Sequence, residues 1–252
     1  MKRLKNILKI EFSVICLFLF TLTVSGQADS VKKSQSGFMS KITYGIKVGA
    51  TLSTFSTEQP HTNFKPGLMG GLFISYKLSE SFALQLEPTY IQQGGNLISI
   101  KDYAMLLVPD PPFFLEVRDQ RITYHNIDLP LLIKYEIPIG GLKVFAVAGP
   151  AIAYNFRTET QSDVSARTYY SIPVYYNFHT EDNISSDIKS WQYGAVGGLG
   201  FETSVGRHTL IFDLRYRYSL NKTYPGYSYL GIFETQGDLR TNTLYFTLGF
   251  GF

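Results

Sequence analysis

The side chains of this 252-residue sequence best suited to proton transfer and metal binding belong to four histidines, His61, His125, His179 and His208. Their separations do not follow the short spacings of a metal site. His125 is the candidate for a catalytic base, because Asn126 and Asp128 follow it closely. A hydrolase also needs a nucleophile and an acid that orients the base. In a strand, Asn126 and Asp128 point away from the face of His125, so an interfacial polar residue is the better interpretation.

Two further features could suggest chemistry. The glycines 194, 197, 198 and 200 resemble a nucleotide-binding loop, but they lie in a strand pattern and open no helix. We expect them to make room for bulky neighbours. Cys16, the one cysteine, lies in an apolar N-terminal run and would leave with it. The sequence therefore predicts no catalytic residue, no cofactor, no metal ion and no disulfide.

The N-terminus has the pattern of a secretory signal peptide. Four basic residues precede the apolar run 12–24, and small residues follow, which predicts a signal peptide at 1–26. The run is shorter than the ~20 residues of a membrane-spanning helix. Removing residues 1–26 takes away four of the 23 basic and one of the 20 acidic residues. The remaining chain is formally neutral, which gives no support for nucleic-acid binding. Residues 27–40 are expected to be a flexible periplasmic lead-in, and 41–252 the folded domain.

The C-terminal residues have the pattern of a β-strand, the kind of element expected to position the side chains discussed above. Large apolar residues occupy every second position from Leu244 to Phe252, and Thr243, Tyr245 and Thr247 begin the alternate set. Successive strand side chains point to opposite faces, so one face suits lipid and the other a polar lumen. Seven further segments repeat the alternation, and the eight lie within 42–52, 68–78, 82–90, 127–137, 142–155, 191–202, 210–218 and 243–252.

The connections between these segments alternate in length. Those around 79–81, 138–141 and 205–208 are tight turns, whereas 53–66, 94–121, 157–189 and 219–241 are long. Aromatic residues also gather near the strand ends, as in the two interfacial girdles of a membrane barrel. The eight steps from Phe82 to Tyr90 rise roughly 20 Å at a tilt of ~40°. The predicted fold is an all-β, eight-stranded antiparallel transmembrane barrel in the outer membrane, with both termini and the short turns periplasmic and long extracellular loops.

The same parity fills the lumen with nearly balanced charge. An eight-stranded barrel is just wide enough for its own side chains, so a salt-bridged filling is expected in place of an open channel. Reversing the parity would put these charges into lipid, at ~2 to 4 kcal/mol for each Lys or Arg near the midplane. The expected lumen network is Lys47, Lys77, Glu87, Asp128, Lys134, Glu136, Lys143, Glu202, Asp213, Arg215 and Arg217.

Several segments resemble a known family. The stretch 127–135, IDLPLLIKY, is similar to a strand motif of the PorT-like outer-membrane β-barrel family, and Ala148-Gly149-Pro150 resembles the Gly-Pro element of its next strand. The stretches 193–201 and 214–218 and the aromatic C-terminus also fit. The resemblance covers essentially the whole mature chain and implies an OmpA/OmpX-like barrel without catalytic residues. It also implies a link to secretion or gliding machinery, which some members have.

The expected loops are rich in aromatic side chains, which often mark a contact surface for protein or glycan. An equally weighted alternative is that the strands extend beyond the membrane and the loops pack on one another. The expected partners are outer-membrane lipid, the barrel-assembly machinery through the Phe252 strand, and a protein or glycan at the loops. We expect a non-enzymatic structural or surface-binding protein; the alternatives are a lipid-modifying enzyme (lipid A deacylase or acyltransferase type) and a small pore. The candidate contact residues are Tyr103, Phe113, Phe114, Tyr169, Tyr170, Tyr175, Tyr176, Tyr227 and Tyr229.

Overall fold

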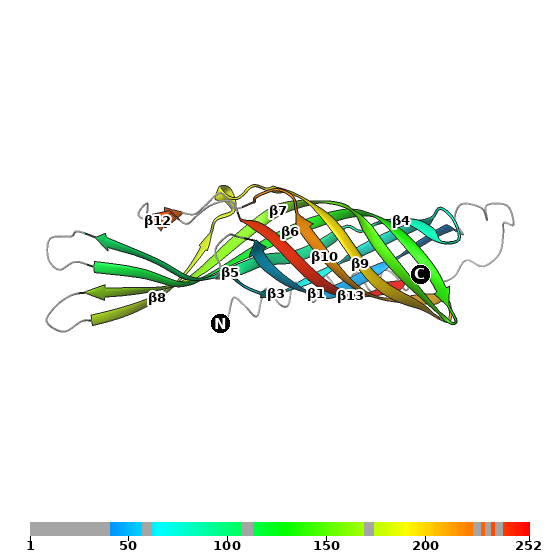
Figure 1. Ribbon diagram of the computed structural model, residues 1–252, viewed down its shortest axis with the longest axis horizontal. Helices are drawn as coiled ribbons and strands as arrows, with labels where there is room; N and C mark the ends of the chain where they lie inside the picture. The colour runs from blue at the N-terminus through cyan, green and yellow to red at the C-terminus, as the bar shows by residue number, and fades with distance from the viewer. Residues whose placement is uncertain are drawn as a thin grey trace, which may run out of the picture. The chain divides into compact units, whose positions relative to one another are not determined.

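The computed structural model describes residues 41–56, 62–106, 113–168, 174–223, 228–229, 233–234 and 239–252 (Figure 1). The expected signal peptide (1–26) and lead-in (27–40) lie outside the described residues. No helix among the described residues is long and apolar enough to cross a membrane.

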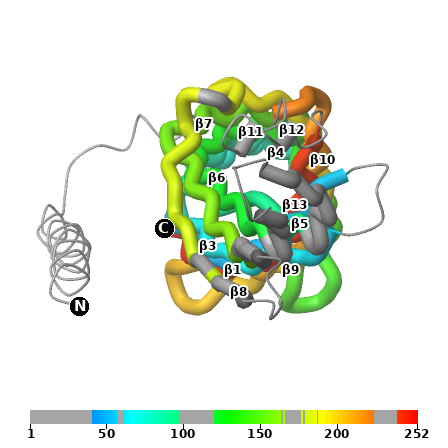
Figure 2. Tube along the Cα trace, turned by 90° about the vertical axis from the view of Figure 1, so that its left-hand side faces the viewer, coloured from blue at the N-terminus to red at the C-terminus, as the bar shows by residue number. Residues whose placement is uncertain are grey.

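Antiparallel strands close into a ring with eight strand positions (Figures 1 and 2). One position is shared by two consecutive strands, β4 and β5, and β13 pairs with β1 to complete the ring. In order around the ring, the strands are β1 (Ile42–Ser56), β3 (Lys65–Lys77), β4 (Phe82–Leu86) with β5 (Thr89–Leu106), β6 (Phe113–Ile139), β7 (Leu142–Thr168), β9 (Trp191–Val205), β10 (His208–Ser219) and β13 (Arg240–Gly251).

The register of the strands sets their tilt. A circuit of paired residues that leaves β1 at Ile42 returns to β1 at Leu52, ten residues further along. At about 3.3 Å per residue and about 4.7 Å between strands, this shear gives a tilt of roughly 40°. The intermediate residues of the circuit are Tyr76, Leu84, Ile133, Ala148, Gly197, Tyr216 and Leu244.

One end of the barrel is made of tight turns and the chain's carboxyl end. The turns after β6 and β9 contain Gly140 and Gly206, whose φ angles of 62° and 65° favour glycine. The amide nitrogen of Phe252 donates to the carbonyl oxygen of Tyr44 over 2.8 Å, which ties the end of β13 to the start of β1. The three predicted tight turns are therefore present and lie at one end.

At the other end, β5, β6 and β7 continue past the rim and are joined by β8 (Val174–Asn183) (Figure 1). These four strands form a sheet in the order β5-β6-β7-β8. The prediction of long loops at 94–121 and 157–189 was therefore wrong for much of both segments. The alternation of the sequence fades in these segments, but strand pairing does not require an apolar face and continues there. The extension of the strands, which is one part of the weighted alternative, is therefore observed.

Small elements complete the rim. The short strand β2 (Thr62–Asn63) pairs with β5, and a 3₁₀ turn, η2 (Ser185–Asp187), follows β8. The strands β11 (Ser228–Tyr229) and β12 (Phe233–Glu234) pair only with each other among the described residues.

Candidate functional site

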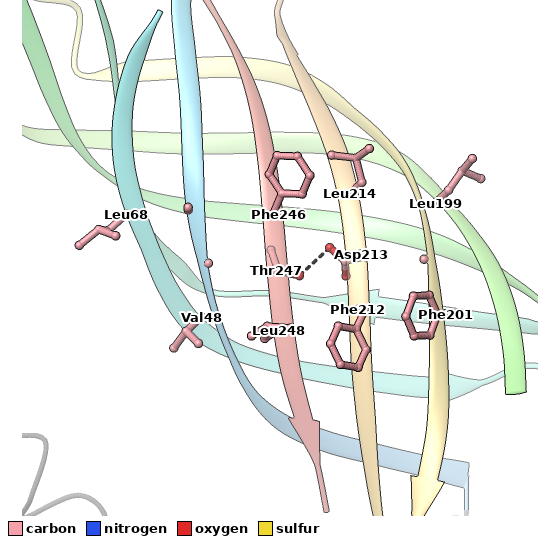
Figure 3. A pocket seen from close by; sticks show the side chains of 13 residues that line it. Val48, Leu68, Leu199, Phe201, Phe212, Asp213, Leu214, Phe246, Thr247 and Leu248 are labelled. Atoms are coloured by element: carbon pink, nitrogen blue, oxygen red, sulfur yellow. Dashed lines mark hydrogen bonds between the residues drawn. The ribbon is translucent and has the colours of Figure 1, made fainter.

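The outer wall of the ring is apolar, as the alternation predicts. Leu199 is 66% exposed and Leu248 54% exposed, whereas Thr247 between lipid-facing neighbours is buried. Figure 3 shows this wall over β13, β10 and β9, where Phe212, Leu214 and Phe246 project outward. On the inner side, the hydroxyl of Thr247 donates to Oδ1 of Asp213 over 2.6 Å. The parity of the strands therefore separates an oily exterior from a polar interior.

Aromatic side chains contact one another near both ends of this wall. Phe82 lies 5.0 Å from Tyr135, ring centroid to centroid, near the turns, and Tyr154 lies 5.1 Å from Trp191 near the opposite rim. Ten residue steps along β9 separate Phe201 from Trp191, which rise roughly 25 Å at the tilt given above. This is the height expected of the apolar band of a membrane barrel.

The charges of the lumen pair across the barrel in layers. Nearest the turns, Nζ of Lys134 lies 2.5 Å from Glu202 and 2.7 Å from Glu136. Lys143 reaches Glu202 over 3.2 Å from a half-exposed position. Lys77, expected in this network, is exposed at the end of β3, and its charge lies close enough to act on Glu136.

The middle layer joins two cations and two carboxylates. Nζ of Lys47 lies 2.8 Å from Glu87 and 2.9 Å from Asp213. Nη1 and Nη2 of Arg215 donate to the two carboxylate oxygens of Glu87 over 2.5 and 2.9 Å, and Nη2 also donates to Asp213 over 2.8 Å. One step further from the turns, Nη2 of Arg217 donates to Oδ1 of Asp128 over 3.3 Å. These charges are buried and compensated, as low-dielectric surroundings require.

Above the charges lies a layer of carboxamides. Nδ2 of Asn126 donates to Gln93 over 3.0 Å and to Gln192 over 3.3 Å, and Nδ2 of Asn155 donates to Asn126 over 2.8 Å. The hydroxyl of Thr158 donates to Asn155 over 2.9 Å. This network crosses the lumen from β5 to β9 and extends the polar filling toward the rim.

An apolar cluster lies at the mouth of the lumen. The ring of Phe55 lies edge-on to Tyr124, 6.1 Å between centroids, and both are buried. Residues from the turn after β8 and from the start of β13 pack against them. The mouth cluster consists of Phe55, Ile122, Tyr124, Ile184, Ile188 and Leu239.

His125 faces outward at the upper rim and has partners that the sequence did not reveal. Its Nδ1 lies 2.7 Å from the hydroxyl of Tyr90, and its Nε2 lies 3.7 Å from Oε2 of Glu159. Glu159 also pairs with Arg157. A β-bulge between Asn155 and Arg157 changes the parity of β7 and turns Glu159 outward. That bulge left no signal in the alternation, so the acid beside His125 could not be predicted.

The other histidines lie apart. His179 on β8 contacts Asp163, with Nδ1 and Oδ1 2.8 Å apart, and the hydrogen bond raises the pKa of His179. His208 stacks near Phe250, 4.8 Å between centroids, and His61 lies outside the described residues. No group of three or more His, Cys, Asp or Glu side chains in the described ranges could hold a metal ion.

The aromatic candidates are divided between strands and undescribed segments. Tyr103 lies on β5, Phe113 and Phe114 on β6, Tyr175 and Tyr176 on β8, and Tyr229 on β11. Tyr169, Tyr170 and Tyr227 lie outside the described residues. Except for Tyr103, which lies where the β5–β6 register is interrupted, the described members have strand partners, and most belong to the four-stranded sheet beyond the rim.

A closed ring of antiparallel strands with an oily wall and a filled polar lumen defines an integral β-barrel of the outer-membrane type. Residues 27–224 match the family model described as "Outer membrane protein beta-barrel domain", and the chain belongs to this family. The protein is therefore integral to an outer membrane.

Among solved structures, the chain is similar to the surface protein NspA of Neisseria, with 12% identity, 82% of this chain and 95% of that chain covered, and a TM-score of 0.38. It is also similar to Ail, the attachment invasion locus protein of Yersinia pestis, with 10% identity, 83% and 98% covered, and a TM-score of 0.36. The N-terminal barrel domain of Pseudomonas aeruginosa OprF shows 13% identity, 82% and 97% covered, and a TM-score of 0.33. The comparison with curated proteins finds no match.

Proposed function

We propose that this protein is a non-enzymatic structural or surface-binding component of the outer membrane, with the turns periplasmic and the four-stranded sheet outside the cell. The observation that carries the proposal is the filled lumen. Paired charges, carboxamides and the mouth cluster succeed one another along the axis, which supports a lumen filled by side chains over a water channel. The part left to interact with partners is the sheet beyond the rim.

Planar-bilayer recording of the purified barrel tests the sealed lumen. No conductance steps are expected from the wild-type protein, because no single side-chain movement removes all the layers. Regular steps of a defined size would contradict the proposal and favour the small pore.

We infer a link to a secretion or gliding assembly from the resemblance of 127–135 to the PorT-like family. Crosslinking in intact cells, followed by identification of neighbouring proteins, tests the link. Repeated recovery of the same envelope proteins is expected, with Arg207→Gln in an exposed turn as a neutral control. Recovery of lipid adducts alone would contradict it.

We also propose that the last strand is the segment that the barrel-assembly machinery engages. Its side chains alternate up to Phe252, which lies at the seam between β13 and β1. Deleting Phe252 is expected to lower the amount of barrel inserted in the membrane at equal synthesis. Unchanged insertion would show that the seam is completed without this residue.

A second candidate function is modification of membrane lipid, and the array of Tyr90, His125 and Glu159 favours it. The imidazole lies between a hydroxyl and a carboxylate on the lipid-facing side of the rim, where a lipid headgroup could approach. Mass spectrometry of membrane lipid from cells with wild-type protein, His125→Gln and no protein tests this candidate. A lipid species that depends on the protein and is lost with His125→Gln would support an enzyme, and an identical profile in all three would remove it.

A further inference from the structure

A row of polar side chains crosses the outer face of the sheet beyond the rim. Residues that are Cα partners on adjacent strands share a face, and neighbouring strands lie about 4.8 Å apart, so five partners in succession span roughly 20 Å. The rim row consists of Asn63 on β2, Asn96 on β5, Arg121 on β6, Gln161 on β7 and Glu181 on β8.

The rim row borders a polar hollow. Asp163 and His179, which pair over 2.8 Å, flank it on the side away from the barrel. The hollow has a volume of about 310 Å³ and is lined by carboxamides, one guanidinium and this carboxylate–imidazole pair. Nε2 of Gln161 donates to Oε1 of Glu181 over 3.1 Å, which fixes one end of the row.

Several of these groups keep their hydrogen-bonding capacity. Within the described part of the chain, the side chains of Asn63, Asn96 and Arg121 make no hydrogen bond. Oδ1 of Asn96 is buried without a partner there, which is unusual for a polar atom in a folded protein. A ligand that both donates and accepts hydrogen bonds would satisfy this row.

The chemistry of the hollow favours saccharide hydroxyls. A carboxamide offers two donors and one acceptor oxygen, which matches a hydroxyl group that donates and accepts. The lining has one guanidinium, that of Arg121, and one carboxylate, that of Asp163, so cations are not in excess as a site for a strongly anionic group would require. Its polar lining is equally unsuited to an apolar ligand.

The position of the hollow indicates where the saccharide comes from. Arg121 lies six residues beyond Ile127 on β6, and Ile127 pairs with Tyr154 of the aromatic girdle, so Arg121 lies roughly 15 Å above that level. Arg121 and Ile127 share one face of β6. The rim row therefore faces sideways, over the neighbouring lipid headgroups, whereas Gln120, which also lines the hollow, is buried on the inner face of β6.

We propose that the rim row binds the saccharide part of a glycolipid in the outer leaflet beside the barrel. The inference rests on the proposed orientation, in which the sheet lies outside the cell. Through this site the protein binds sideways to the saccharide layer of its own membrane. The far edge of the four-stranded sheet stays uncovered.

Calorimetric titration of the detergent-solubilised protein tests this proposal. The probes are lipopolysaccharide from the producing cells and the saccharide that mild acid releases from it. Arg121→Gln, and Asn96→Ala combined with Gln161→Ala, are each expected to weaken binding of the released saccharide at least tenfold. Arg207→Gln, the same change of charge in an exposed turn at the other end, is expected to bind like the wild type. Hydrogen exchange of the wild type with and without saccharide gives a readout that needs no variant, and protection is expected at 94–97 and 119–122.

The outcomes separate the proposals. Wild-type protein that binds no released saccharide, or variants that bind it unchanged, would overturn the inference. Binding of intact lipopolysaccharide alone would do the same, because the contact would then belong to the acyl chains.

Labelling of an Asp163→Cys variant in intact cells with an impermeant maleimide checks the orientation independently. Labelling in intact cells without saccharide binding leaves the proposed function standing and removes only this inference. Labelling that needs a permeabilised outer membrane removes the proposed orientation, whatever binds in detergent.

Discussion

The lumen of the barrel and the outer face of the sheet both carry charges and carboxamides, but the two regions differ in how these groups are paired. In the lumen, Lys47 contacts two carboxylates and Arg217 is paired with Asp128. On the outer face of the sheet, the exposed side chains of Asn63 and Arg121 have no hydrogen bond within the described residues. Burial penalises any unpaired polar group, whereas water compensates an exposed one until a ligand replaces it. Polar groups therefore seal the first region and leave the second available for binding.

The largest expected effect comes from breaking a buried pair in the lumen. Asp128→Leu leaves the fully buried guanidinium of Arg217 without its carboxylate and is expected to lower the free energy of unfolding by about 3–5 kcal/mol. The double variant Asp128→Leu with Arg217→Met removes both charges and is expected to recover most of the loss. Urea unfolding in lipid vesicles measures both values. A double variant as unstable as the single one would show that pairing is not what the lumen requires.

The outer wall gives the next largest effect and tests the parity of the strands. Leu248→Arg puts a charge near the middle of the apolar band and is expected to cost about 2–4 kcal/mol in the same assay. Val205→Arg makes the same kind of change beside a turn, at the edge of the band, and is expected to cost at most about 1 kcal/mol. Equal costs at the two positions would contradict the placement of the wall in lipid.

A pair of glycines on β9 sharpens the contrast between the two faces. A Cβ on Gly198 would lie 2.6 Å from Cγ of Arg215 in the lumen, whereas a Cβ on Gly197 would have its nearest neighbour at 3.9 Å on the lipid side. Gly198→Ala is expected to destabilise the barrel by about 1–3 kcal/mol through overpacking. Gly197→Ala is expected to be near neutral. Equal unfolding midpoints for the two variants would show that the lumen has spare room.

The sequence predicted the barrel better than the sheet, for a physical reason. Alternation is enforced where one face meets lipid, so the inward direction of Lys47 and Arg215 follows from parity alone. Beyond the rim both faces can be polar, as at Thr160 and Gln161, and the alternation fades although the strands continue. The partners of a charge depend on register: Arg215 meets Glu87 across 128 residues of sequence. The bulge that brings Glu159 to His125 depends on backbone geometry that the residue types do not predict.

The smallest effect is expected at His179, on the solvent-exposed sheet beyond the rim. The hydrogen bond to Asp163, with a further contribution from Glu181, raises the pKa of His179 above its usual 6.5. A raised pKa means that the pair favours the folded state below about pH 6.5 and loses this effect as the pH rises through the pKa of the folded protein. Because the imidazole is solvent-exposed, the change is expected in its NMR titration and not in the unfolding midpoint.

Asp163→Asn is expected to move the midpoint of that titration down toward 6.5, with Glu181 retaining part of the shift. Bound saccharide should also change the midpoint, because Asp163 and His179 line the hollow. A midpoint indifferent to both Asp163→Asn and saccharide would mean that this pair is only a solvated contact, and the contrast between a sealed lumen and a binding face would then depend on the rim row alone.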